Sequence, residues 1–408
     1  RGGTTTTHYV ARCDYRGIEG VIKRTNNEMI YPRIEVTHRM FDNAFKINAG
    51  LSGYKQTYFA GSDDDNGYNN DVYRNAITYN PTTPIKDANG NWSESPSKTD
   101  YLNPVALIDE VEGQNQATNL RMFASAIFTP FEGFDMKYLV SSETYNQTRG
   151  YFQTSKHIWS YKNGRTGFAS RGARRVVDDL SELTASWKKT LFKDHTFNLL
   201  AGYSWMRTNY QMLWMQNFNF PSDDYTYNSM GNGQALKDGR AAEFSEQKEN
   251  KLIGYFGRFN YSYKGKYMLA ASLRHEGSSN FGANHKWGTF PSVTAAWSLK
   301  DEGFMQNVPL LSQLKLRAGY GVTGTEPTDP YMSLNTLDFG TYVYYNGSFI
   351  KTIRPASNAN PNLRWERKTE TNMGADFGFL NDRITGSVDY YNRTTSDLLW
   401  NYQVPLPP

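Results

Sequence analysis

The chain has 408 residues and a formal net charge of +4, with 44 Lys and Arg against 40 Asp and Glu. Its mean hydropathy of −0.69 is polar, yet 15% of its residues are aromatic, whereas disordered chains of this polarity are normally poor in aromatic residues. The basic residues are scattered along the chain, so no stripe of positive charge marks a nucleic-acid-binding surface. Composition therefore argues against a disordered chain and against a nucleic-acid partner.

A membrane-spanning helix needs about 18 or more apolar residues in a row, and the sequence contains no such run. Transmembrane β-strands remain possible, because only every second residue of such a strand has to be apolar. The single cysteine, Cys13, has no partner for a disulfide within the chain. The chain starts at Arg1 without a signal peptide, so we expect a processed or incomplete chain.

Apolar and polar residues alternate with a period of two in many segments that are bounded by Gly, Asn, Asp or Pro. In the first clear example, Phe45, Ile47 and Leu51 share one face, while Lys46 and Asn48 share the other. This alternation is typical of strands with one apolar and one polar face, and it predicts about thirteen of them. In chain order they are 4–15, 29–40, 44–56, 117–130, 134–146, 180–192, 195–213, 250–264, 266–279, 284–299, 313–322, 368–380 and 383–395.

Short and long connections alternate between successive predicted strands along the chain. The long, polar links are 57–116, 147–179, 214–249 and 323–367, and all of them fall at one end of the strands. The link 300–312 falls at the other end, where we expect a small helical turn. Short periplasmic turns and long extracellular loops are typical of outer-membrane barrels. The sequence therefore predicts an all-β fold, an antiparallel transmembrane β-barrel over residues 1–408, with a soluble β-sandwich as the alternative.

Several stretches of the chain resemble one family of bacterial membrane proteins. The clearest is YFGRFNYSYKGKYMLAASLRHEGSSNFGANHKWGTFPSVTAAW, from Tyr255 to Trp297. Others are LKLRAGYGVTGTEPTDPY from Leu314, NPNLRWERKTETNMGADFGFLNDRITGSVDYYNRTTSDLL from Asn360 and FPSDDYTY from Phe220. In these stretches and in their order, the chain resembles the SusC/RagA-type TonB-dependent outer-membrane transporters. The resemblance is specific over roughly the C-terminal half and looser before it.

The resemblance implies a barrel of about 22 strands, a plug inside it, a periplasmic segment bound by TonB, and a SusD-type surface lipoprotein over the barrel. It also implies TonB-dependent import of a large nutrient, an oligosaccharide or a peptide, across the bacterial outer membrane. The chain departs from this pattern, because it has too few strands and neither a plug-like segment nor a TonB-contacting motif. We therefore expect a partial barrel that further sequence must close, since an open edge in lipid leaves backbone groups unpaired.

Polar positions of the predicted strands are candidates for lining the lumen or contacting the plug. They are Lys46, Asn48, Arg274, Glu276, Lys315 and Arg317. Two long loops carry candidates for contact with substrate or with the lipoprotein, because rings stack on sugars and charged groups pair with ionic ligands. These are Trp159, Tyr161, Arg165, Asp223, Asp224 and Tyr225. Packing of the loop against neighbouring loops or against the lipoprotein is the alternative for Trp159, Tyr161 and Arg165.

Asp63, Asp64 and Asp65 could bind calcium through their hard carboxylate oxygens, although their spacing is not that of an EF-hand, and a solvated loop is the alternative. The neighbouring Asp223 and Asp224 could suggest an acid–base pair, but nothing nearby completes a hydrolase. We therefore predict a transporter rather than an enzyme, with no cofactor. The alternatives to energised import are a passive outer-membrane porin and a surface β-rich adhesin.

Overall fold

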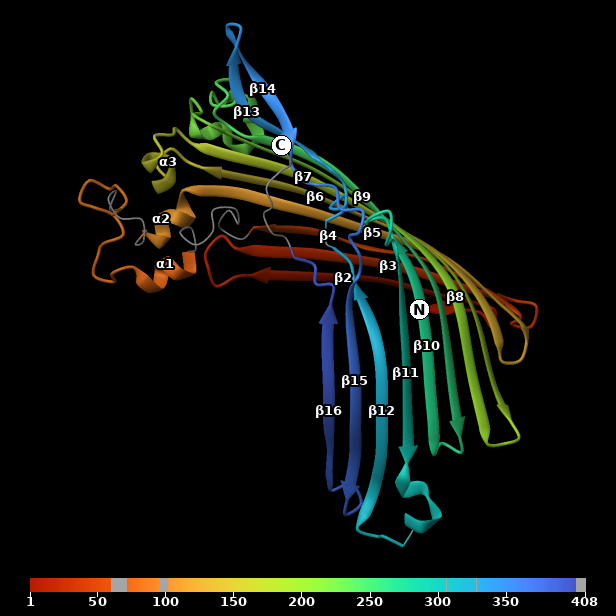
Figure 1. Cartoon of the computed structure of the whole chain (residues 1–408). Coiled ribbons are helices and arrows are strands. Elements are labelled where there is room, and N and C mark those ends of the chain that lie inside the picture. The colour runs from red at the N-terminus through yellow and green to blue at the C-terminus, as the bar shows by residue number, and fades with distance from the viewer. Residues whose placement is uncertain (60–71, 95–101, 306, 328, 401–408) are drawn as a thin grey trace.

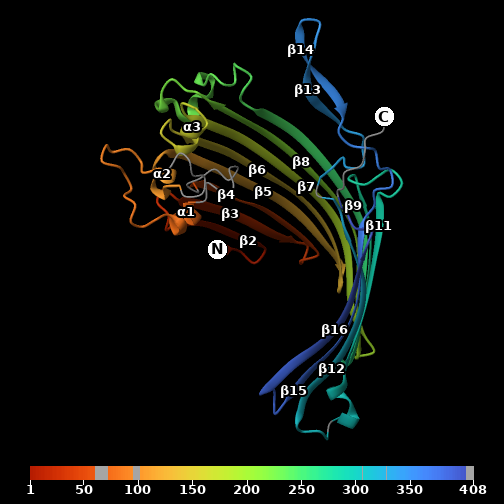
Figure 2. The same ribbon diagram turned by 60° about the vertical axis from the view of Figure 1, so that its left-hand side comes forward.

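The computed structural model describes residues 1–59, 72–94, 102–305, 307–327 and 329–400. Fourteen strands form one antiparallel sheet in the order β1 to β12, β15 and β16, and β13 and β14 form a separate hairpin. The sheet is a curved and strongly twisted wall, in which β10, β11, β12, β15 and β16 run at a steep angle to β2 to β6 (Figures 1 and 2). Among the described residues, β1 and β16 are its two edges. The predicted all-β antiparallel fold is confirmed.

The strands of the sheet are β1 (Gly2–Gly3), β2 (Thr7–Glu19), β3 (Asn26–Met40), β4 (Phe45–Phe59), β5 (Val111–Phe131), β6 (Phe134–Gln153), β7 (Phe168–Leu191), β8 (His195–Phe218), β9 (Glu243–Tyr263), β10 (Tyr267–Ser278), β11 (Trp287–Ser298), β12 (Leu311–Thr325), β15 (Glu366–Phe379) and β16 (Ile384–Ser396). The separate hairpin consists of β13 (Leu337–Tyr345) and β14 (Ser348–Pro355). Short helices are α1 (Val72–Thr78), α2 (Pro104–Asp109), α3 (Ile158–Lys162), η2 (Asp223–Asn232), η3 (Leu299–Asp301) and η4 (Gly303–Met305). Within the described ranges, no helix is long and apolar enough to cross a membrane.

The thirteen predicted strands correspond to β2 to β12, β15 and β16, but several of them run further than predicted. Strand β7 begins at Phe168 instead of near residue 180, and β7 and β8 have 24 residues each. A tilted strand needs only about 9 to 11 residues to cross a bilayer. The extensions carry polar residues on both faces, such as Arg174 and Arg175, so the alternation that marked the strands stops there. The predicted loop bounds were therefore too wide, and the β6–β7 loop shrinks to 154–167.

Tight turns join the strands at the end opposite to the long loops. Between β9 and β10, Lys264 and Gly265 have φ values of 51° and 70°. Positive φ at both central residues is the type I′ geometry, whose twist matches that of the strands it connects. The link between β11 and β12 holds η3 and η4, which confirms the small helical turn predicted at 300–312.

Strand register divides the sheet into two faces. The apolar face carries Ile47 and Leu273, and the polar face carries Asn48 and Arg274. Ile47 is 39% exposed and Leu273 52% exposed, so large aliphatic side chains lie uncovered along the apolar face. Exposed aliphatic rows over a whole sheet would be unfavourable in water, whereas lipid accommodates them.

Two rows of aromatic rings lie across the apolar face. The lower ring row, near the tight turns, consists of His195, Tyr263, Tyr267 and Trp297. The upper ring row, nearer the loops, consists of Tyr203, Tyr255, His275 and Trp287. Tyr263 lies eight positions after Tyr255 on β9, which is about 27 Å along the strand. Because such strands tilt by about 35 to 45°, this spacing corresponds to roughly 20 Å along the membrane normal, close to the apolar band of about 25 Å that aromatic girdles border in outer-membrane barrels.

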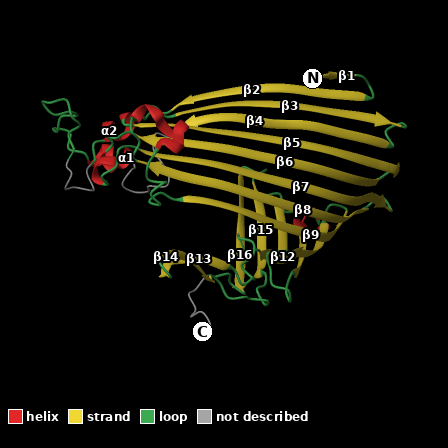
Figure 3. Cartoon of the chain, turned by 90° about the horizontal axis from the view of Figure 1, so that it is seen from above, coloured by secondary structure: helices red, strands yellow, loops and turns green. Residues whose placement is uncertain are grey.

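Helices α1, α2 and α3 gather at the loop end of the sheet (Figure 1), and the view from above shows α1 and α2 beyond the ends of the strands (Figure 3). Their buried apolar side chains form one small core, here called the loop cap. It consists of Val72, Leu102, Leu107, Ile108 and Ile158. Asn103, which is fully buried, caps α2 by accepting hydrogen bonds from the backbone N–H groups of Val105 and Ala106.

Candidate functional site

The polar face brings all six strand candidates to the same side of the sheet. Lys46 on β4 and Arg274 on β10 belong to one register row. That row passes through Ile127, Lys137, Thr184, Gly202 and Phe256. The pairs Ser272–Ser292 and Ser292–Gly321 carry the same face on to β12, and therefore to Lys315 and Arg317. Asn48 and Glu276 share this face because each lies two residues from a member of the row.

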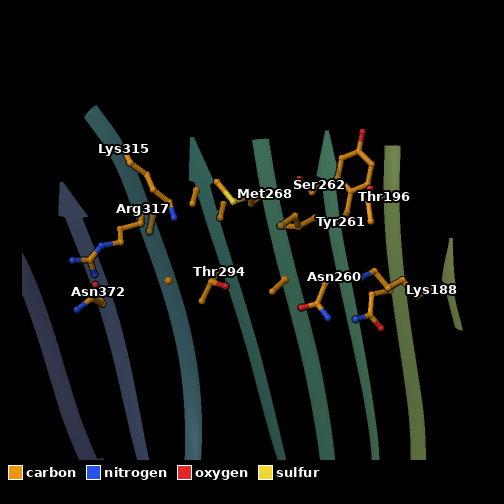
Figure 4. Close-up of a pocket in the computed structure, with 17 residues that line it drawn as sticks. Lys188, Thr196, Asn260, Tyr261, Ser262, Met268, Thr294, Lys315, Arg317 and Asn372 are labelled. Carbon is orange, nitrogen blue, oxygen red and sulfur yellow. The ribbon is translucent and has the colours of Figure 1, made fainter. Parts of the chain in front are cut away.

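A hollow of about 700 Å³ opens on the polar face near the tight turns (Figure 4). Its polar lining includes Lys188, Asn198, Asn260, Thr294, Lys315 and Arg317. Ala270 and Gly319 also line it, and their small size leaves the space open. Within the described part of the chain, Lys188 and Lys315 form no ion pair, so the hollow presents positive charge that the wall itself does not neutralise.

The two arginine candidates are held by carboxylates of the wall. Arg317 on β12 contacts Asp376 on β15, with Nη2 3.1 Å from Oδ1, and Asp389 on β16, with Nη1 2.8 Å from Oδ1. Arg274 donates from Nε to Oε2 of Glu276 at 3.0 Å and from Nη2 to its other oxygen. The predicted shared face of Arg274 and Glu276 thus becomes a direct pair on one strand.

A second hollow, of about 410 Å³, lies on the polar face of β8 and β9 near the loops. Tyr210 and Thr208 line one side of it, and Lys248 lies on the other side. Lys248 contacts two carboxylates, Glu246 at 2.9 Å and Asp329 at 3.3 Å. This hollow therefore combines an aromatic ring, a hydroxyl group and a charge network at the rim of the polar face.

Sequence reasoning missed a set of polar-face residues in the strand extensions. Arg174 lies over the ring of Tyr145, 5.0 Å from its centroid. The side-chain amide of Gln147 donates to the hydroxyl group of Tyr58 at 2.7 Å. Tyr145 and Gln147 continue the parity of Lys137 along β6, so counting by two beyond the last apolar residue would have placed them on this face.

In the β6–β7 loop, the structure separates the three predicted contact residues. Trp159 packs against the loop cap, and Arg165 lies over the ring of Phe218 at 4.3 Å. Burial lowers the pKa of Arg165 below its ordinary value. Tyr161, by contrast, is 65% exposed. Loop packing thus occupies Trp159 and Arg165, while contact of Tyr161 with a partner or substrate stays a prediction.

Asp223 joins the β8–β9 loop to the β6–β7 loop. Its carboxylate accepts hydrogen bonds from the backbone N–H and the hydroxyl group of Ser155, both at 2.8 Å. Asp224 accepts a local hydrogen bond from Ser222 at 2.9 Å, and Tyr225 is 40% exposed. The two neighbouring carboxylates have different partners, so Asp223 has a structural contact and Asp224 and Tyr225 stay predicted contact residues.

His157 is the buried titratable group of the loop cap. Its Nδ1 accepts a hydrogen bond from the backbone N–H of Trp159 at 3.3 Å and so caps α3. Burial lowers the pKa of His157 to about 4, so the ring is neutral at pH 7. Glu94 accepts from the backbone N–H of Asn103 at 3.2 Å, and burial raises the pKa of Glu94.

The calcium candidates Asp63, Asp64 and Asp65 lie outside the described residues, so calcium binding there stays a prediction. Elsewhere, in the ranges that the structure covers, no group of three or more His, Cys, Asp or Glu side chains is placed to hold a metal ion.

The family model described as "TonB dependent receptor-like, beta-barrel" matches residues 41–406. A TonB-dependent receptor of Formosa agariphila is 26% identical over 406 residues, which are 99% of this chain and 40% of that protein. The TonB-dependent receptor SusC of Bacteroides thetaiotaomicron is 43% identical over 162 residues, or 38% of this chain and 16% of SusC. The chain thus spans about 40% of the length of the relatives that it matches from end to end.

Solved structures show the same fold. The RagAB peptide transporter superposes with a TM-score of 0.81 at 22% identity, over 99% of this chain and 44% of that chain. A ferripyoverdine receptor of Pseudomonas aeruginosa superposes with a TM-score of 0.54 at 10% identity, over 96% of this chain. At these identities the similarity concerns the fold, a continuous antiparallel wall with tight turns at one end.

Proposed function

This chain belongs to the family of TonB dependent receptor-like β-barrels, and on that premise we propose that the whole protein imports a large nutrient, an oligosaccharide or a peptide, across the outer membrane. Membership of this family makes the sheet part of an outer-membrane β-barrel. In the proposal, residues 1–408 are one segment of that barrel. Because the chain spans about 40% of its relatives, we assign the plug and the TonB-contacting segment to the rest of the protein.

The observation that carries the proposal is the contrast between the two faces of one sheet. The apolar face exposes aliphatic side chains and carries two ring rows, as a lipid-facing surface does. The polar face has hollows and charged groups, as the wall of a water-filled lumen does. In this account Lys46, Asn48 and Lys315 line the lumen or contact the plug, while Arg274 and Arg317 are already paired with carboxylates of the wall.

We also propose that a SusD-type surface lipoprotein covers the loop end. The similarity to SusC supports such a partner, and so do aromatic rings that are exposed at the loop end. Tyr161 is 65% exposed, and Tyr344 and Phe349 of the β13–β14 hairpin are 64% and 71% exposed. Since an isolated two-stranded hairpin is marginally stable in water, a covering protein would stabilise it.

The test of import uses the full-length gene in its own bacterium. A strain without the gene is first compared with its parent on defined glycans and peptides, to find the nutrient that it no longer uses. Import driven by TonB predicts that deleting TonB abolishes growth on that same nutrient. Normal growth without TonB would contradict the proposal, and steady conductance of the purified protein in planar bilayers would then assign it to passive porins.

A further inference from the structure

The apolar face changes its chemistry beyond the upper ring row. On β8, Arg207 lies four residues beyond Tyr203, and Gln211 lies eight residues beyond it, about 27 Å along the strand. At the level of Gln211, exposed amide, hydroxyl and guanidinium side chains from four neighbouring strands replace the aliphatic rows. We call this surface the outer polar field. It consists of Asn146, Thr148, Arg175, Gln211, Ser245 and Gln247.

Register makes the outer polar field continuous. Asn146, Arg175, Gln211 and Gln247 are direct partners in one row across β6 to β9. In the next row, Thr148 and Ser245 lie on either side of Ala173 and Leu213. Both rows line a hollow of about 630 Å³. Because side chains alternate, Gln147, Arg174 and Met212 point to the polar face and contribute only backbone to the floor of this hollow.

The six side chains have unused hydrogen-bonding capacity. All six are exposed, and among the residues that the structure describes none of them makes a side-chain hydrogen bond or an ion pair. On the polar face of the same strands, by contrast, Gln147 and Lys248 are engaged by neighbours. Amide groups offer donors and acceptors side by side, and hydroxyl groups do the same, which suits the hydroxyl-rich surface of a saccharide.

A charged level separates this field from the rings. The carboxylate of Glu249 contacts Arg207 at 2.8 Å and Lys251 at 2.9 Å, so two cations share one anion. Asp179 lies in the same row as Arg207 and accepts from Ser142 at 2.8 Å. The charges of Arg207, Lys251, Glu249 and Asp179 balance at this level, and Arg175 in the adjoining outer polar field adds one positive charge. In a membrane, the lipid headgroups lie directly beyond the hydrocarbon region, and with the ring rows at the borders of the apolar band this is the level of Arg207 and Lys251.

We propose that the outer polar field binds the saccharide headgroup of an outer-leaflet glycolipid. The phosphates of this lipid lie near Arg207 and Lys251, and its acyl chains pack on the apolar face between the ring rows. Strands β6 to β9 extend far beyond the thickness of the bilayer. In this proposal their extensions contact the headgroup sugars, which lie alongside them, and also support the long loops. This inference depends on the proposed orientation of the barrel in the membrane. It does not depend on nutrient import and goes beyond it.

The test measures glycolipid bound to the full-length protein. The protein is purified in mild detergent, stripped of lipid and titrated with glycolipid from the same bacterium, with native mass spectrometry as the readout. The triple variant Arg175→Ala/Gln211→Ala/Gln247→Ala should bind roughly tenfold more weakly, since it loses several hydrogen bonds. The matched control Gln147→Ala/Arg174→Ala/Met212→Ala changes the neighbouring residues on the polar face and should bind as the wild type does. Equal binding by wild type and triple variant would overturn the proposal.

Further binding experiments distinguish a glycolipid from free carbohydrate as the ligand of the outer polar field. A glycolipid trimmed to its acylated, phosphorylated core lacks the saccharide, so it should bind the wild type and the triple variant with equal affinity. That affinity should be lower than the affinity of the wild type for intact glycolipid. Detached saccharide that binds as tightly as intact glycolipid would assign the field to free carbohydrate and overturn the proposal. A change of oligomeric state without a change in lipid binding would also overturn it. The variant Ala173→Trp fills the hollow without removing a polar group and should also weaken glycolipid binding. It provides a second test of the site in case the triple variant fails to fold.

Discussion

Arg317 on β12 and Asp389 on β16 form an ion pair across an entire intervening strand, with Nη1 2.8 Å from Oδ1. The strand between them is β15, and the register places Gly374 directly between the two residues. A Cβ atom at Gly374 would come within 2.6 Å of Asp389 Oδ1 and 2.8 Å of Arg317 Cζ. The missing side chain is therefore what allows this contact, which ties together the last three strands of the sheet.

Substitution Gly374→Val should push Arg317 and Asp389 apart and destabilise the folded barrel by about 1 to 3 kcal/mol, the usual cost of forcing atoms into a filled space. The cost should be smaller in an Arg317→Ala background, because the contact is already absent there. Urea unfolding of the full-length protein in detergent measures both values. Gly257→Val is the control, since a Cβ there meets only Leu200 O at 3.7 Å. Equal costs in the two backgrounds would refute the assigned role of Gly374.

Charge reversal in the 700 Å³ hollow should impair uptake. Lys188 lines the hollow on the polar face, whereas the adjacent Lys189 points to the apolar face. Lys188→Glu should reduce the import rate several-fold, because it changes the sign of charge presented to the plug or cargo. Lys189→Glu should leave the rate near that of the wild type. Uptake is compared at equal amounts of protein in the outer membrane, and equal losses for both variants would contradict the assignment of faces.

Acid should loosen the loop cap. The pKa of His157 falls from 6.5 to about 4 on folding, so the unfolded segment binds more protons than the folded one as the pH drops through this window. Stability of the cap is therefore lost from about pH 6.5 down to about pH 4, at up to about 1.4 kcal/mol per pH unit. The raised pKa of Glu94 acts in the opposite sense above its ordinary value and offsets part of this loss.

Hydrogen exchange of the α3 backbone at pH 7 and pH 5 measures the opening of the cap. His157→Asn keeps a good helix-capping side chain but cannot titrate, so exchange in this variant should respond less to pH. The difference between wild type and variant isolates His157 from Glu94. If both proteins respond equally, protonation of His157 does not open the cap.

The sequence predicted the membrane-crossing part of the wall well, because lipid on one side imposes alternation on every strand. Leu269 and Leu273 on one face and Ser272 and Arg274 on the other were separable by parity alone. Beyond the bilayer this constraint ends, so the strand extensions and the β13–β14 hairpin were predicted as loops. The ion-pair partners of Arg317, which are Asp376 on β15 and Asp389 on β16, depend on strand register. Register could not be predicted from the sequence.

The loop candidates show the same limit more strongly. Trp159 and Asp223 were correctly placed in long loops, but their contacts with the loop cap and with Ser155 join segments far apart in the chain. Residue type identified them as rings and charges suited to a ligand. Only the fold shows that loop packing already uses them, and that Tyr161 and Tyr225 remain exposed.

The central claim is that one face of this sheet meets lipid and the other does not, and spin labels along β10 test it most directly. Single cysteines at positions 268 to 273 are labelled in a Cys13→Ser background of the full-length protein in outer-membrane vesicles. We predict that collisions with lipid-dissolved oxygen alternate with a period of two, high at Leu269, Ala271 and Leu273 and low at Met268, Ala270 and Ser272. Collision rates without alternation, or with the opposite parity, would contradict the account.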